Sequence, residues 1–386
     1  MLPYYLLLLL PGLAYFGFTH SPSYKQADRR TLTVFFVLYF LLLALRGSTV
    51  GNDYGTYHYW FESMGSAEWS YVFQTDLEPG YLLLNKVVSV FTDSFQWFLA
   101  VSSAVMILPI LYVYRKHIED APLTILLFIN TDIFVMFFSG IRQSIAIGIG
   151  CLAFEFAREK KWIRFLIAVV FATLFHKSAF VLLLLYPACR FRLRKKSLYY
   201  IIPAYLILLV FNREIFSFLL SAFGIYSGYS IAQTGAFMSI VLFSLFVVYS
   251  IVIPDENRLD ETGKMLRNIL LITLAIMTFA PIHMMVMRMA YYFVVIIGVV
   301  ATIAYFLIRL VYVQIKSKDA GRKKLQLMKS VAGIVIAVAI YMIFMNIKPA
   351  RKMIINVDFP VATAAFSAVV LVFIWFLMKS KLGHDF

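Results

Sequence analysis

Two arginines, two acids and a histidine are the residues of this chain whose types suit group-transfer chemistry. Arg142 and Arg288 each lie among polar or aromatic residues at the edge of an apolar run. A guanidinium group forks two hydrogen bonds to phosphate oxygens, so the pair suits a diphosphate. Fixed cations also stabilise the charge that develops on a leaving diphosphate. The two arginines therefore predict a reaction in which a diphosphate leaves, with no cofactor and no metal.

A transfer of this kind onto a sugar hydroxyl needs a base that takes up the hydroxyl proton. Asp53, Glu78 and His176 are all candidates, and the sequence leaves the choice among them open. Asp53 with Glu78 would also suit a metal ion, although nothing else in the sequence points to one. Flat aromatic side chains that suit sugar rings lie in the same part of the chain, namely Tyr57, Trp60, Trp69 and Tyr81.

Each of these residues also has a purely structural explanation. Arginines at helix ends snorkel, and tyrosines gather in the aromatic belt at a membrane surface. A single histidine is more often an interface residue than a catalyst. Glu155, near the end of an apolar run, is expected to snorkel as well. The grouping of the residues, rather than any one of them, favours a functional site.

The elements that position these residues follow from the composition. Of the 386 residues, 62% are hydrophobic and only 14% are charged, and the mean hydropathy is +0.84. A soluble globular chain carries about 25% charged residues. Long apolar runs indicate helices, because a segment in lipid must satisfy its own backbone hydrogen bonds. We therefore expect an all-α, polytopic transmembrane helical bundle that forms a single domain over residues 1–386.

About thirteen membrane spans are expected, the first of them a retained span and not a signal peptide. They lie near residues 2–18, 31–45, 95–114, 121–139, 142–157, 162–175, 178–190, 197–211, 236–253, 268–281, 288–310, 330–347 and 360–378. A further apolar piece, Tyr81 to Phe91, rises only about 17 Å as a helix, too short for a bilayer core of about 30 Å. We predict an interfacial or re-entrant helix there, inside an outer loop at residues 46–94.

Lysine and arginine residues indicate the orientation. One side of the predicted topology holds 26 of the 35 basic residues, including a basic loop at residues 309–329, and is expected to be cytoplasmic. The net charge of +15 then reflects topology and affinity for anionic lipid, with no nucleic-acid partner. If Tyr81 to Phe91 spanned the membrane instead, residues 46–79 would be cytoplasmic, and the basic loop at 25–30 would face outward against the rule. Cys151 and Cys189 lie in apolar segments, which argues against a disulfide.

Four stretches on the predicted outer face give a more specific signal when they are taken in order. They are Arg46 with Gly51-Asn-Asp53 and Tyr57, Glu78-Pro-Gly-Tyr81, Ser139-Gly-Ile-Arg142-Gln143-Ser144, and Phe175-His176-Lys177-Ser178-Ala179. In these stretches the sequence resembles the EpsG family of bacterial polysaccharide-synthesis proteins, whose members behave like Wzy-type polymerases. The resemblance covers Arg46 to about Arg194, and Arg288-Met-Ala-Tyr-Tyr-Phe293 is similar to a later family element.

The resemblance implies a membrane glycosyltransferase that makes capsule, exopolysaccharide or O-antigen at the outer face of the bacterial inner membrane. It would polymerise oligosaccharide units carried on undecaprenyl diphosphate and release undecaprenyl diphosphate. The implied catalytic residues are Asp53, Arg142, His176 and Arg288. The implied substrate-binding residues are Arg46, Tyr57, Glu78, Tyr81, Gln143, Lys177, Ser178, Tyr291 and Tyr292. Expected partners are the lipid-linked oligosaccharide and the bilayer, with a flippase and a chain-length regulator in addition.

Two other function classes compete with this interpretation. A flippase or transporter of lipid-linked oligosaccharide would show internal repeats and a polar path near the bilayer midplane, and the sequence shows neither clearly. A membrane acyltransferase that modifies the polysaccharide would use a histidine and the outer arginines, but acyl transfer does not call for an acidic first loop.

Overall fold

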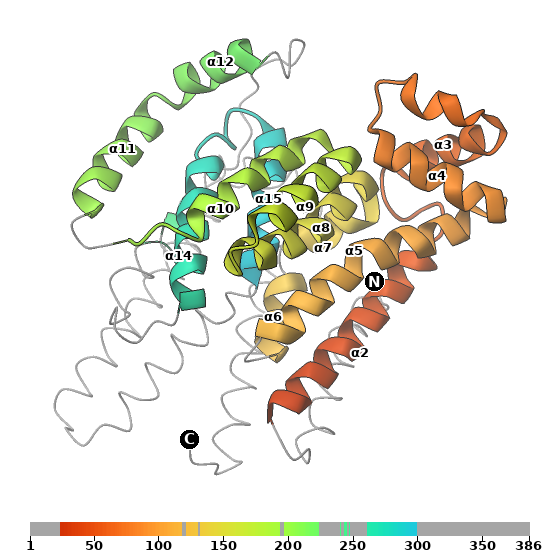
Figure 1. The fold of residues 1–386 in the computed structure, drawn as a ribbon, viewed down its shortest axis with the longest axis horizontal. Helices are drawn as coiled ribbons and strands as arrows, with labels where there is room; N and C mark the ends of the chain where they lie inside the picture. Colours follow the sequence, from red (N-terminus) through yellow and green to blue (C-terminus); the bar gives the residue numbers. More distant parts are fainter. Residues whose placement is uncertain are drawn as a thin grey trace, which may run out of the picture. The chain divides into compact units, whose positions relative to one another are not determined.

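The computed structural model describes residues 24–117, 121–129, 132–193, 197–223, 240, 243–244, 247 and 261–298. All of them belong to one compact unit, which consists of residues 1–233 and 237–301. The described residues form helices joined by turns and contain no strand, which confirms the predicted all-α class for this part of the chain (Figure 1). The expected spans at 2–18, 330–347 and 360–378, most of the span at 236–253 and the basic loop at 309–329 lie outside the described residues.

The long apolar runs form helices close to their predicted positions. These helices are α2 (Tyr24–Ala44), α5 (Phe95–His117), α8 (Ile141–Arg158), α9 (Trp162–Phe175), α11 (Leu198–Val210), α14 (Glu261–Met277) and α15 (Met284–Gly298). Helices α2 and α14 begin several residues before the predicted spans, in polar turns that contain Lys25 and Lys264. A hydropathy search detects only apolar residues and therefore misses these polar turns. The turns are still helical, because lysine is a good helix former.

One predicted span differs in the structure. The expected span at 178–190 is a 3₁₀ helix, η2 (Lys177–Leu184), followed by the short α10 (Leu185–Ala188). The described residues of the expected span at 121–139 are helical, in α6 (Ala121–Ile129) and α7 (Asp132–Ser139). An additional helix, α12 (Asn212–Phe223), follows α11. This helix was not predicted, because its first turn, Asn212-Arg213-Glu214, is polar and the prediction was based on apolar runs.

One helix of the described part is both long and apolar enough to cross a bilayer by itself, namely α5 with 23 residues. Helix α11 and the first part of α12 meet the same criterion together, but they are bent by 79°. The apolar helix α9 and the pair formed by η2 and α10 are shorter. The described residues do not establish the expected thirteen spans, so that number stays a prediction.

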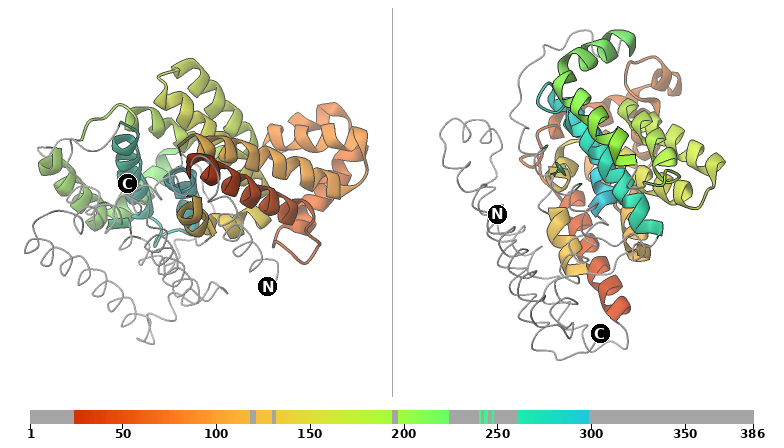
Figure 2. Two further views of the ribbon diagram at one scale, coloured as in Figure 1. Left: turned by 90° about the horizontal axis from the view of Figure 1, so that it is seen from below. Right: turned by 90° about the vertical axis from the view of Figure 1, so that its left-hand side faces the viewer.

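The first loop after α2 is mostly helical. It contains α3 (Tyr54–Ser66), η1 (Trp69–Phe73) and α4 (Pro79–Phe91), so the short helix expected at 81–91 is present and is preceded by an unpredicted one. Figures 1 and 2 show α3 and α4 (orange) together at one end of α5. The ammonium group of Lys86 on α4 donates hydrogen bonds to the carbonyls of Met64 (3.1 Å) and Ala67 (2.7 Å). This contact holds the C-terminal end of α3 against α4, where free carbonyls favour a cation.

Helix α8 is the centre of the packing, with α5 and α9 against it and α2 against α5. Glycine lets α8 approach α5 closely, because a Cβ atom at Gly148 would lie 2.5 Å from the carbonyl oxygen of Met106. The two ends of α8 carry different polar groups. Arg142 and Gln143 lie in its first turn, and Glu155 and Arg158 lie in its last.

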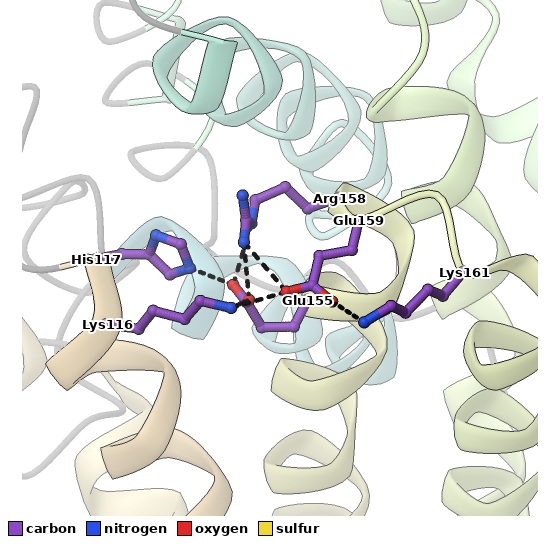
Figure 3. A network of polar contacts seen from close by, with 6 residues as sticks. All are labelled: Lys116, His117, Glu155, Arg158, Glu159 and Lys161. Atoms are coloured by element: carbon purple, nitrogen blue, oxygen red, sulfur yellow. Dashed lines mark hydrogen bonds and ion pairs between the residues drawn. The ribbon is translucent and has the colours of Figure 1, made fainter.

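Glu155 is the centre of an ion cluster at the C-terminal end of α8 (Figure 3). Its carboxylate accepts hydrogen bonds from Lys116 (2.6 Å) and Arg158 (3.1 Å) and contacts the ring of His117. The prediction that Glu155 snorkels was wrong. Its side chain is buried and is held by cations within the protein. The cluster joins the last turn of α5 to the last turn of α8, and so fixes the relative register of two helices that reach the candidate site at their other ends.

Candidate active site

The carboxylate of Glu78 is where three distant stretches of the chain meet. One oxygen, Oε2, accepts a hydrogen bond of 2.5 Å from Nη1 of Arg142. The other, Oε1, lies 3.1 Å from Nδ1 of His176 and accepts a hydrogen bond of 3.2 Å from the backbone N–H of Lys177. The Glu78 side chain is only 6% exposed, compared with 30% for Arg142 and 28% for His176. The carboxylate is therefore enclosed, while its two partners keep an open side.

Each member of this cluster comes from a helix end. Glu78 is the residue before α4, which has Pro79 in its first turn, a position where the missing N–H costs nothing. Arg142 lies in the first turn of α8. His176 has an extended backbone between α9 and η2, so the N–H of Lys177 is one of the free donors at the start of a helix. Glu78 satisfies that donor, which explains why the acid lies at this junction.

Two close backbone approaches hold the helix ends in place. A Cβ atom at Gly80 would lie 2.8 Å from the carbonyl oxygen of Leu174, so glycine lets the start of α4 reach the end of α9. Gly51 has a positive φ of 96°, and a Cβ atom there would lie 2.0 Å from the carbonyl oxygen of Phe138. The neighbouring N–H of Asn52 donates a hydrogen bond to Oγ of Ser139 (3.1 Å). The glycine-containing loop is thereby held beside the start of α8.

Two tyrosines form one wall beside Arg142. The guanidinium carbon lies 5.8 Å from the ring centre of Tyr81, and the rings of Tyr57 and Tyr81 are 5.8 Å apart. The Tyr57 side chain also lies close enough to Arg142 to interact with its charge. Burial raises the pKa of Tyr57, although the charge of Arg142 opposes that effect, so the phenol is neutral at physiological pH. These contacts fix the arginine side chain before any substrate binds.

The charge state of Glu78 follows from its partners. Burial raises the pKa of its carboxyl group, but the hydrogen bond from His176 and the charge of Arg142 together outweigh burial and bring the pKa to about 2. Glu78 is therefore ionised at neutral pH and is a poor proton acceptor. Of the three candidate bases, it is better suited to orienting Arg142 and His176 than to taking up a proton.

His176 is placed differently. Because Nδ1 faces the Glu78 carboxylate, the neutral ring carries its proton on Nδ1 and leaves a lone pair on Nε2, which lies on the opposite side of the ring. This is the arrangement in which a carboxylate orients a histidine base. Asp53 precedes α3, one turn before Tyr57, whose N–H donates to the Asp53 carbonyl (3.0 Å). Its side chain is half-buried near Tyr57 and stays a second candidate base.

Helix α15 is attached to the same region by two contacts. Nε2 of Gln143 donates a hydrogen bond of 2.7 Å to the carbonyl oxygen of Arg288. The hydroxyls of Ser178 and Tyr292 lie 3.1 Å apart. The Arg288 side chain is exposed and is brought near Arg142 only through its backbone, while Tyr291 and Tyr292 are buried.

Two further predicted binding residues lie around this cluster. Arg46 is 4% exposed; its Nη1 donates to the Phe137 carbonyl (3.4 Å), while its Nε and Nη2 are buried without a hydrogen-bond partner. Its charge lies close enough to Tyr54 and Tyr57 to interact with them electrostatically. The ammonium group of Lys177 instead donates to the carbonyl of Asp76 (3.1 Å) and is exposed. The structure thus places Lys177 beside the site through its backbone rather than through its charge.

A family model named EpsG family matches residues 29–315. The match covers most of the chain and includes every residue of the candidate active site. The chain belongs to the EpsG family. Members of this family are Wzy-type polysaccharide polymerase-like proteins, associated with membranes and with polysaccharide biosynthesis. No match was found among the curated proteins or among the solved structures.

Because the EpsG family is associated with polysaccharide biosynthesis, the relevant property of the cluster is the set of groups that it offers to such a reaction. Within the described residues, no group of three or more acids, histidines or cysteines is placed to hold a metal ion. The groups that are present are an oriented histidine, a fixed guanidinium and an enclosed carboxylate. The sequence motifs of this EpsG chain contain all three, but they gave no indication that Glu78 joins the other two or that the Lys177 N–H takes part.

Proposed function

We propose that this EpsG protein is a polymerase of lipid-linked oligosaccharide units. The substrate would carry its saccharide on undecaprenyl diphosphate at the outer face of the bacterial inner membrane. The contact of Glu78 with both Arg142 and His176 is the observation that supports this proposal most strongly. It combines a base and a phosphate-binding cation at one carboxylate, as transfer from a glycosyl diphosphate requires.

In the proposed reaction, a hydroxyl at the non-reducing end of a new lipid-linked unit attacks the anomeric carbon of the growing chain. A carbon–oxygen bond forms to the hydroxyl oxygen, and the bond from the anomeric carbon to the diphosphate breaks. Nε2 of His176 takes up the hydroxyl proton. Undecaprenyl diphosphate leaves with the bonding electron pair, and Arg142 stabilises its charge.

Glu78 has two effects in this scheme. It holds His176 in the tautomer that can accept a proton, and it favours the imidazolium ion that results. It also fixes one N–H group of Arg142, which leaves the exposed part of the guanidinium for a phosphate oxygen. We assign the exposed Arg288 as a second cation for the diphosphate, and Tyr57 and Tyr81 as the aromatic wall.

The outward face of α4 supports a location at the membrane surface. Tyr81, Leu82 and Lys86 are buried on one side of this helix. Leu83, Val87, Val90 and Phe91 recur at helical spacing on the other side and are exposed. An exposed apolar face on a short helix is typical of one that lies in the interface plane. Such a position would keep Glu78, directly before α4, at the depth of lipid headgroups in a bundle of about thirteen spans.

The proposal can be tested in cells by comparing the polymer made by variants of Arg142 and Arg288 with the polymer made by a control arginine variant. Arg142→Ala and Arg288→Ala are expected to abolish polymer while the protein still inserts, so that single repeat units stay on the lipid. Arg213→Ala removes another exposed arginine, on α12, and is expected to leave chain length unchanged. Normal polymer in both site variants would overturn the proposal, as would equal loss in the control.

A further inference from the structure

An apolar groove is lined by residues of α5, α8 and α9. Its volume is about 650 Å³, and it is lined by twelve residues, eleven of them apolar. Helix α8 forms the floor with Ile149 and Leu152, α5 forms one wall with Val101 and Leu108, and α9 forms the other. Helices α5 and α9 each pack on α8, and residues of all three helices line the groove.

The groove ends one helical turn from the candidate active site on both walls. On the α9 wall, the ring of Phe171 lies 5.4 Å from that of Phe175, and the next residue, His176, contacts Glu78. On the α5 wall, Val101 is followed one turn towards the helix start by Phe98. The ring of Phe98 lies 6.2 Å from that of Tyr81, which stacks beneath Arg142. Two independent paths therefore connect the apolar lining to the polar cluster.

The groove is also open to its surroundings along its length. Leu108, Ile167 and Phe171 line it and are exposed. The charged lining residue, Arg164, lies near the start of α9, at the end remote from His176. A long apolar chain that begins at the polar cluster could thus enter from the side and meet no charge until the far end.

We propose that this groove binds the isoprenoid chain of the lipid carrier, with the diphosphate at Arg142. The inference rests on the proposed function, because that function requires a diphosphate joined directly to an apolar chain. At about 30 Å³ for a group of the size of water, the groove holds roughly 20 carbon-sized groups, or about four isoprene units. It would bind the first units next to the diphosphate and leave the rest of the chain in the bilayer.

The test uses the full-length chain in lipid nanodiscs and a C55 polyprenyl diphosphate that carries a diazirine on its second isoprene unit. After irradiation, the labelled residues are identified by mass spectrometry. Labels are expected on lining residues of α5, α8 and α9, and excess unlabelled polyprenyl diphosphate should displace them. Labels on α4 alone, or equal displacement by phosphatidylglycerol, would overturn the inference and show an ordinary lipid surface. The inference would also be overturned if α5, α8 and α9 carried no label because another segment of this chain covers the groove.

Substitutions provide a second measurement. Ala104→Trp fills the groove and is expected to lower the labelling of its lining by roughly tenfold, as overpacking a close apolar site does. Val170→Trp places the same side chain on an exposed position of α9 outside the groove and should have no effect. Polymerisation by the same preparations separates the two proposals. Labelling in the groove without polymerisation contradicts the proposed function alone, whereas polymerisation that is unaffected by Ala104→Trp, with labels elsewhere, contradicts the groove alone.

Discussion

The substitution Glu78→Gln isolates the charge at the centre of the candidate site. It keeps the size and shape of the side chain and removes the negative charge that Arg142 and His176 share. Lowering the pKa of this carboxyl group from an ordinary 4.5 to about 2 corresponds to roughly 3 kcal/mol of folding stability at neutral pH, since one pKa unit is worth about 1.4 kcal/mol. Because the carboxylate is almost fully buried, solvent screening reduces this contribution little.

The pH dependence gives the sign of this effect. A carboxyl group whose pKa is lower in the folded state stabilises the fold above the pKa of the unfolded chain, and that stabilisation is lost as the pH falls through the folded value. The free energy of unfolding of the wild type should thus exceed that of Glu78→Gln by roughly 3 kcal/mol at pH 7. The difference should shrink between about pH 4.5 and pH 2.

The assay is reversible unfolding of the purified protein in mixed micelles at several pH values. Glu62→Gln is the control, because Glu62 lies on α3 in an exposed pair with His58 and its side chain is 65% exposed. Such a pair contributes about 0–1 kcal/mol, so the control should behave like the wild type. Equal stability of wild type and Glu78→Gln at pH 7, or a difference that persists at pH 2, would refute the assigned electrostatics.

Three further substitutions test the assigned roles and the topology. Arg142→Lys should fold normally but lower kcat by roughly 10- to 100-fold in a polymerisation assay, because an ammonium group cannot contact Glu78 and a phosphate with a planar fork; unchanged kcat would contradict the role. His176→Ala should lower kcat by about 10²- to 10⁴-fold, whereas Asp53→Asn should keep kcat close to that of the wild type. If instead Asp53→Asn lowers kcat by this factor and His176→Ala does not, Asp53 is the base. A cysteine introduced by Ser48→Cys, at an exposed position of the first loop, should react with a membrane-impermeant thiol reagent added from outside, and protection from that reagent would place the loop in the cytoplasm.

Hydropathy predicted the helices that are continuous apolar runs. Helices α5 and α9 begin at the predicted residues, because their first turns are already apolar. It missed α3 and α12, whose polar faces bring the average hydropathy down, and it could not distinguish the 3₁₀ helix η2 from an α-helix. Both kinds of helix satisfy backbone hydrogen bonds within one apolar segment, so composition carries no signal for the difference.

The motifs predicted the neighbourhood of the site but not its connections. Glu78, Arg142 and His176 were each singled out from residue type and order. Their pairing joins residues 64 and 98 positions apart, and only the packing of α4, α8 and α9 brings those positions together. The role of Glu78 changed most, from a candidate base to an ion partner of Arg142 and His176. Its pKa depends on these two neighbours, and the sequence does not show that they lie beside it. Arg288 was expected at the cluster, and the structure brings only its backbone there, through Gln143.

The most direct test of the whole account is polymerisation by the purified protein in vesicles that contain lipid-linked repeat units, with and without a chelator. The wild type should produce a ladder of chains and release one polyprenyl diphosphate for each linkage formed. Arg142→Ala and His176→Ala should produce neither, although both remain inserted. Ladders of normal length from both variants would contradict the account, and so would a wild type that moves the lipid-linked units across the bilayer without joining them.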